Sequence, residues 1–126
     1  MILADTHVFF WWIHDRGKLS HTAYEALRSA DQITISTITC WELAMLFAKG
    51  RLGLSTDAMT WILEAMARTH VKAIPLEIGP AIRAVEFTQL RDPADQQIVA
   101  TALDLDVPLI TKDKRIRDSG VVETIW

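Results

Sequence analysis

The stretch Met1-Ile2-Leu3-Ala4-Asp5 decides how this chain folds. Its first four residues are apolar and predict a buried strand, and Asp5 is the first charged residue in the sequence. An unpaired buried charge is costly, so an acid directly after such a strand needs a compensating partner. Ligands of parallel α/β sheets bind beyond the carboxyl ends of the strands, and Asp5 stands at such an end. Asp5 is therefore the first candidate for a functional site.

Three more acids occupy comparable settings in the sequence. Glu42 lies inside an apolar helical segment, Asp95 in the first turn of another predicted helix, and Asp113 just after the apolar run at 108–111. If these carboxylates converged with Asp5, each pair would repel by roughly 4 kcal/mol at about 4 Å with an effective dielectric of about 20. A divalent cation removes that repulsion. The four acids therefore predict a metal-dependent enzyme.

The order of predicted elements indicates an α/β fold. Strands and helices alternate along the chain, which favours a mostly parallel sheet covered by helices on both faces. Gly50 is a natural stop for the third helix, because glycine adopts the left-handed conformation without strain. The predicted strands are 2–4, 32–36, 71–76, 108–111 and 121–125, and the predicted helices are 8–13, one capped by Ser20, 38–48, 56–69, 80–90 and 93–105.

Length and composition set further bounds. The 126 residues fit a single domain over 1–126, and half of them are hydrophobic, as in a globular protein. No apolar stretch approaches the roughly 20 residues of a membrane helix, and no signal peptide is evident. The single cysteine, Cys40, excludes an intramolecular disulfide, and we expect a cytoplasmic protein. The net charge of −3 argues against a broad nucleic-acid-binding face, although Lys49–Arg51 and Lys112–Arg117 are locally basic.

The segment Asp92-Pro93-Ala94-Asp95 combines a helix start with a candidate ligand. An acid at the N-cap, proline at the next position and an acid in the first turn all suit a helix amino terminus. Capping accounts for Asp92. Asp95 shares a helix face with Ile98 and Val99, so we expect it to turn toward the core and assign it to the site.

Two threonines are candidates for supporting the acids. Thr6 and Thr111 stand at strand ends, from where their hydroxyls can donate hydrogen bonds to ligating carboxylates. The four histidines have no zinc-binding spacing, and we expect His7 to pack or hydrogen-bond locally. The sequence also lacks the glycine-rich motifs of nucleotide-binding sites.

Four stretches of the sequence carry a family resemblance. They are Leu3-Ala4-Asp5-Thr6-His7-Val8 with Trp11-Trp12, Trp41-Glu42-Leu43-Ala44 with Lys49-Gly50-Arg51-Leu52, Arg91-Asp92-Pro93-Ala94-Asp95 running into Ile98–Ala102, and Leu109-Ile110-Thr111-Lys112-Asp113. In their order and spacing, these stretches resemble a PIN domain, and specifically a VapC-type ribonuclease toxin of toxin–antitoxin pairs. The likeness covers essentially the whole chain.

The resemblance implies a three-layer α/β/α sandwich and a Mg²⁺- or Mn²⁺-dependent endoribonuclease. The acidic quartet of the family falls on Asp5, Glu42, Asp95 and Asp113, and Asp92 belongs to the same family segment. An RNA substrate, a small antitoxin protein and a homodimer are implied as partners. Gln96 departs from the pattern, because many relatives carry an arginine there.

Two other readings of the acids stay open at this stage. A haloacid-dehalogenase-like phosphatase also has an aspartate after its first strand, but it needs a second aspartate two residues later, where this chain has His7. A non-catalytic scaffold or docking domain could use the acids to bind a cation. For association, we expect a two-fold dimer formed largely by the helices at 38–48 and 56–69, through Trp41, Met45, Leu46, Phe47, Trp61 and Met66.

Overall fold

Five parallel strands form the centre of the computed structural model, which describes residues 1–126. The strand order is β3-β2-β1-β4-β5, so the first strand lies in the middle. The prediction of a mostly parallel sheet is confirmed, and the sheet has no antiparallel member. The strands are β1 (Ile2–Ala4), β2 (Ile33–Ser36), β3 (Lys72–Ile74), β4 (Leu109–Ile110) and β5 (Thr124–Ile125).

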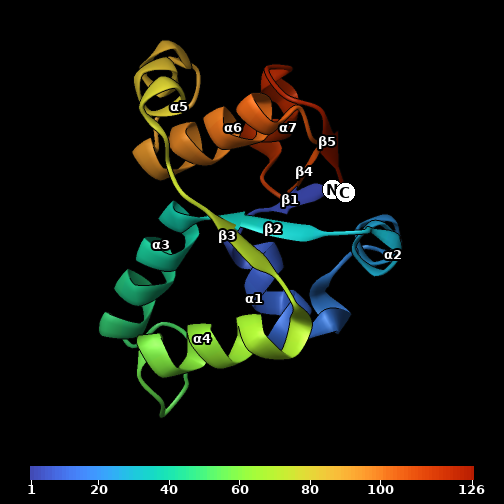
Figure 1. Ribbon diagram of the computed structural model, residues 1–126, viewed down its shortest axis with the longest axis vertical. Helices are drawn as coiled ribbons and strands as arrows, with labels where there is room; N and C mark the ends of the chain where they lie inside the picture. The colour runs from blue at the N-terminus through green and yellow to red at the C-terminus, as the bar shows by residue number, and fades with distance from the viewer.

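Helices cover both faces of this sheet, which gives the α/β/α sandwich that the sequence predicts (Figure 1). On one side lie α1 (Thr6–His14) and α4 (Ala58–Thr69), with α2 (His21–Ser29) and α3 (Thr37–Ala48) at the two ends of that layer. On the other side lie α5 (Ile78–Arg83), α6 (Pro93–Leu105) and α7 (Lys114–Ser119). Two short 3-10 turns, η1 (Arg16–Lys18) and η2 (Ala84–Glu86), complete the order.

The alternation of side chains along each strand separates two hydrophobic cores. Ile2 and Ala4 point into the core beneath α1 and α4, whereas Leu3 points into the core beneath α6 and α7. Leu109 and Ile110 divide between the two cores in the same way. The strands are therefore apolar on both faces, as buried parallel strands must be.

The strand order also explains where a site can form. From β1 the chain moves outward through β2 to β3 and then returns to the opposite side of β1 for β4 and β5. The direction of progression reverses between β1 and β4, and such reversals open a crevice at the carboxyl ends of the strands. Asp5 follows β1 and Asp113 follows β4 within three residues, so both reach this crevice.

Two segments differ from the sequence prediction. The helix expected at 80–90 is instead α5 followed by η2, and Gln96 Nε2 donates to the carbonyls of Phe87 and Leu90 at 3.2 and 2.6 Å. A side chain thus satisfies acceptors that a continued helix would have used. The helix α7 lies in a polar stretch without apolar periodicity, where only Ile116 is buried, and its formation was not predicted.

The helix α3 is only partly buried, although an apolar helix of this composition is expected to be largely buried. Only Thr39 and Leu43 of this apolar helix are buried, and Trp41 is 58 % exposed. The reason is its position, because α3 lies at the margin of the molecule and packs mainly on α1, α4, α6 and the β2 end of the sheet (Figure 1). No helix has both the length and the apolar composition that a membrane span requires.

Candidate metal and active site

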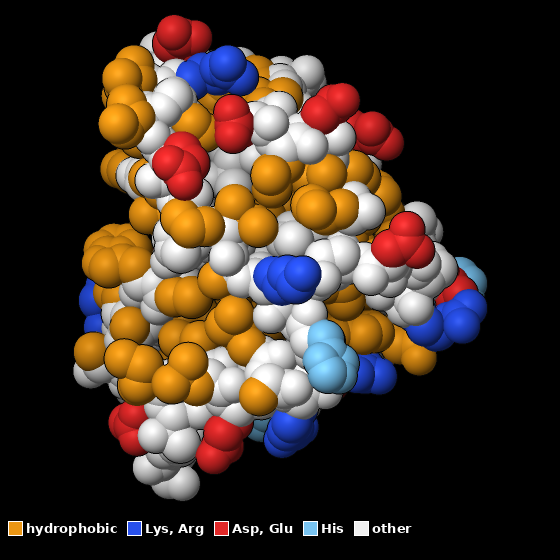
Figure 2. All heavy atoms as spheres, in the orientation of Figure 1, with side chains coloured by type: hydrophobic (Ala, Val, Ile, Leu, Met, Phe, Trp, Pro, Cys, Tyr) orange, Lys and Arg blue, Asp and Glu red, His pale blue; other side chains and the backbone are white.

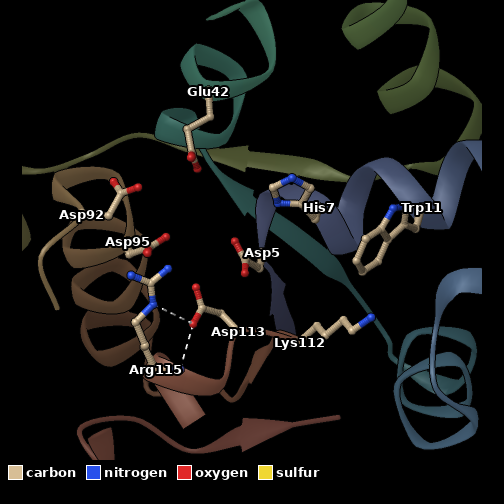
Figure 3. A pocket seen from close by; sticks show the side chains of 9 residues that line it. All are labelled: Asp5, His7, Trp11, Glu42, Asp92, Asp95, Lys112, Asp113 and Arg115. Carbon is tan, nitrogen blue, oxygen red and sulfur yellow. Dashed lines mark hydrogen bonds and ion pairs between the residues drawn. The ribbon is translucent and has the colours of Figure 1, made fainter. Parts of the chain in front are cut away.

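A cavity of about 410 Å³ opens at the crevice and is lined almost entirely by charged side chains (Figure 3). All four predicted site residues meet in it, each from a different part of the fold. Asp5 comes from the end of β1, Glu42 from α3, Asp95 from α6 and Asp113 from the start of α7. The remaining lining residues are His7, Trp11, Asp92, Lys112 and Arg115.

Asp5 is buried at the cavity and held by two hydrogen bonds. It caps α1, where its Oδ1 accepts from the Thr6 backbone amide at 2.6 Å, and its Oδ2 accepts from the Thr111 hydroxyl at 2.6 Å. The side chain is only 8 % exposed, and this burial raises its pKa even though the two hydrogen bonds favour the ionised form. Thr111 in turn accepts from the Asp113 amide at 3.0 Å, which ties two of the acids to one hydroxyl.

Glu42 is anchored from the first turn of α1. The Thr6 hydroxyl donates to Glu42 Oε1 at 2.6 Å and lies 3.1 Å from the Thr39 hydroxyl. Burial raises the pKa of Glu42, and the nearby charges of Asp5 and Asp92 raise it further. The predicted hydrogen bonds of Thr6 and Thr111 are present, because each hydroxyl donates a short hydrogen bond to one of the acids.

Asp95 is the least compensated acid in the cavity. Its carboxylate accepts no hydrogen bond, and it faces the cavity from a half-buried position (Figure 3). Burial, followed by the charges of the four other acids, raises its pKa to about 7. A carboxylate in such surroundings gains more from a bound cation than one already held by hydrogen bonds.

Asp92 and Asp113 combine capping with a place in the cavity. Asp92 caps α6 by accepting from the Ala94 amide at 2.8 Å, as predicted, and it also lines the cavity. Asp113 caps α7 by accepting from the Arg115 amide at 2.8 Å, and the Arg115 guanidinium lies 3.9 Å away (Figure 3). Of these two acids, only Asp92 was predicted from the sequence to be a cap.

Basic and aromatic residues complete the lining of the cavity. Lys112 and Arg115 line it, whereas Lys114 pairs with Asp118 on the surface of α7. His7 packs locally, as expected, with its ring 5.8 Å from that of Trp11, and it also lines the cavity. The spacing of these two rings, four residues apart on a helix that begins at the site, is the sequence signal that indicates their shared face.

The donor set fits a hard divalent cation. All candidate ligands are carboxylates, which suit Mg²⁺ or Mn²⁺, and no histidine–cysteine combination suggests zinc. No three acidic or imidazole side chains already form a closed metal cage. An open arrangement suits Mg²⁺ in particular, because this ion keeps several of its waters and needs only a few protein ligands.

The fold and cavity together define an α/β protein with an acidic pocket at the switch point of a parallel sheet. The model of the PIN domain family matches residues 2–121. A relative in sequence is Ribonuclease VapC22 of Mycobacterium tuberculosis (strain ATCC 25618 / H37Rv). The two sequences are 31 % identical over 116 residues, which cover 92 % of this chain and 89 % of that protein. The chain belongs to the PIN domain family.

Solved structures support the fold assignment. VapBC2 from Rickettsia felis, bound to a DNA fragment from its promoter, aligns with a TM-score of 0.70 at 14 % identity and covers 98 % of this chain and 97 % of that one. VapBC-1 from nontypeable Haemophilus influenzae aligns with a TM-score of 0.66 at 21 % identity and covers 98 % and 96 %. At these identities the likeness establishes the fold.

Proposed function

We propose that this protein is a metal-dependent endoribonuclease and the toxin of a toxin–antitoxin pair. The observation that carries the proposal is the convergence of Asp5, Glu42, Asp95 and Asp113 on one cavity at the switch point of the sheet. The relative at 31 % identity is a ribonuclease by name, and the structures that share the fold are described as VapBC complexes or toxin–antitoxin systems.

Asp5 and Asp95 would hold Mg²⁺ or Mn²⁺, with Glu42 and Asp113 as further ligands or partners of its waters. When bound, such a cation lowers the pKa of a water and neutralises charge that develops on the phosphodiester. The hydroxyls of Thr6 and Thr111 keep the carboxylates of Glu42 and Asp5 in one orientation. Orientation of ligands by such partners sets metal affinity, so both threonines belong to the site.

Lys112 and Arg115 would receive the RNA backbone at the rim of the cavity. Cations in such positions bind phosphates and orient a strand without reading its sequence. Gln96 stands where many relatives carry an arginine. Its side-chain amide donates to the carbonyls of Phe87 and Leu90 and is therefore not free to bind RNA.

The apolar edge of the molecule supports a dimer through a surface that overlaps the predicted one at α3 and α4 and extends onto α5 and η2. Trp61 packs on Phe10 and Phe47, with ring centroids 5.2 and 5.9 Å away, and so contributes to the core rather than to a partner surface. Large exposed apolar side chains lie instead on α3, α4 and α5–η2, namely Trp41, Met59, Leu63, Ile78, Ile82 and Val85. Figure 2 shows hydrophobic side chains gathered along this edge.

We infer that this edge joins two copies of the chain, and that an antitoxin is the second protein partner. Contiguous apolar surface of this kind is rarely left uncovered in a monomer. Ile78, Ile82 and Val85 follow one another at intervals of four and three residues and so form one stripe along α5 and η2.

The test of the nuclease is hydrolysis of RNA with Mg²⁺ or Mn²⁺, compared between the wild type and Asp5→Asn. We expect loss of nearly all cleavage in the variant, with folding unchanged by circular dichroism. Asp104→Asn is the matched control, because Asp104 is exposed on α6 outside the cavity. Cleavage retained by Asp5→Asn would refute the assignment, whereas metal binding without any turnover in the wild type would favour the scaffold.

A further inference from the structure

The acidic cavity continues along α1 into a second pocket of different character. This pocket, of about 430 Å³, shares His7 and Trp11 with the cavity, so the two spaces adjoin across these rings. No acid of the quartet lines the second pocket. Its further lining residues are Phe10, His14, Asp15, Lys18, Leu46, Arg51 and Leu52.

Aromatic rings line the way from the first space into the second. His7 and Trp11 lie four residues apart on α1, with ring centroids 5.8 Å apart, and Phe10 and His14 repeat the spacing at 5.1 Å. His7 and His14 are exposed and Trp11 is half-buried. One helix therefore presents a row of rings that begins beside the carboxylates and leads away from them.

Positive charges accompany these rings on both sides. Lys112 Nζ lies 5.7 Å from the centre of the Trp11 ring, at the acidic end. At the far end Lys18 and Arg51 are exposed and form no ion pair, and Asp15 is the single acid beside them. Rings on which bases stack, bordered by cations that follow the backbone, are the features by which proteins bind single-stranded nucleic acid.

We propose that this second pocket is a subsite for single-stranded RNA, which receives a nucleotide flanking the cleaved phosphodiester. The inference rests on the proposed nuclease function and adds a path for the strand. A base would stack on the exposed ring of His14 or on Trp11, against the apolar wall of Leu46 and Leu52. Arg51 and Lys18 would bind the phosphates on that side. The subsite offers affinity for the strand at a distance from the acids, which repel phosphate.

The experiment compares two substrates, one that fills only the acidic cavity and one long enough to enter the second pocket as well. Bis(p-nitrophenyl) phosphate occupies only the acidic cavity, whereas a random-sequence pool of 12-nucleotide single-stranded RNA extends into the second pocket. The measured quantity is the ratio of kcat/KM for RNA to kcat/KM for the small diester. We expect Arg51→Gln and His14→Ala each to lower this ratio about tenfold, mainly through KM, since stacking and phosphate contacts contribute on this scale.

Arg68→Gln provides the matched control for the loss of a positive charge. Arg68 is exposed at the last turn of α4 and lines a separate cleft with Gln32 and His70, near the amino ends of β2 and β3. In Arg68→Gln, the ratio of kcat/KM for RNA to kcat/KM for the small diester should stay within twofold of the wild-type ratio. The dependence of log kcat/KM for RNA on log salt should also become shallower in Arg51→Gln, by about 0.7 for one lost phosphate contact.

The outcomes separate the subsite from the nuclease itself. If the wild type hydrolyses both substrates but neither variant lowers the ratio more than Arg68→Gln does, the subsite is refuted and the nuclease stands. If the wild type hydrolyses neither substrate, the nuclease is refuted and the subsite with it. Inhibition of diester hydrolysis by a polyglutamate peptide that is lost in Arg51→Gln, with an unchanged RNA ratio, would assign the pocket to a protein partner instead. A melting temperature within about 2 °C of the wild type shows that each variant is folded.

Discussion

Replacement of Asp95 by asparagine tests the electrostatics of the cavity directly. In the folded protein the pKa of Asp95 is raised from 3.8 to about 7, first by burial and then by the charges of Asp5, Asp92, Asp113 and Glu42. The folded protein therefore binds this proton more tightly than the unfolded chain does. Consequently, the stability due to this group is present below about pH 4 and is lost as the pH rises toward about 7.

The size of the effect follows from the two pKa values. A difference from 3.8 to about 7 corresponds to about 4 kcal/mol at 1.36 kcal/mol for each pH unit. Part of the Asp95 side chain is exposed, so solvent screening reduces the effect, and we halve it to about 2 kcal/mol. Asparagine has nearly the same shape and no charge. Without metal, Asp95→Asn should therefore be more stable than wild type at pH 8 by about 2 kcal/mol, with a much smaller difference at pH 4.5.

Urea unfolding in EDTA, from pH 4.5 to pH 8, measures this difference. The free energy of unfolding of the wild type should fall relative to Asp95→Asn over that range, whereas Asp104→Asn should follow the wild type, because Asp104 is an exposed acid on the same helix. Addition of Mg²⁺ at pH 8 should stabilise the wild type more than Asp95→Asn, since binding to the folded state adds RT ln(1 + [Mg²⁺]/Kd). Parallel pH profiles of wild type and Asp95→Asn would refute the reasoning.

Three further predictions follow from the site and the apolar edge. Asp92→Ala should lose roughly 1 kcal/mol of stability with its cap and less activity than Asp95→Ala; equal losses of kcat/KM would place Asp92 among the ligands. Thr111→Val should weaken Mg²⁺ binding, measured by calorimetry, by about tenfold or more, because Asp5 loses an orienting hydrogen bond; unchanged affinity would contradict that role. Ile82→Glu should convert a dimer to a monomer in sedimentation at micromolar concentration, while Glu64→Gln, at an exposed position of α4, should not; a monomeric wild type would refute the dimer.

The sequence alone determined the elements whose signals are local. Apolar runs bounded by a polar residue predicted the five strands, and Ser20, Asp92 and Gly50 marked helix ends where the structure has them. The four acids that line the cavity could be selected from the sequence because a carboxylate stands out against an apolar run or a strand end. Two differences in secondary structure have causes close in the sequence. The α7 segment has no apolar period, and the carbonyls of Phe87 and Leu90 accept from Gln96, nine and six residues further on.

Only the tertiary structure decided which of these residues meet and what remains uncovered. Asp5 and Thr111 lie 106 positions apart, and their hydrogen bond depends on β1 and β4 being neighbours in the sheet, which no local pattern specifies. The exposure of α3 likewise depends on its place at the margin of the molecule, although its sequence is that of a buried helix. Composition and spacing report how much apolar surface an element carries, whereas packing determines which part is covered. The acidic cavity and the apolar edge are both products of that packing.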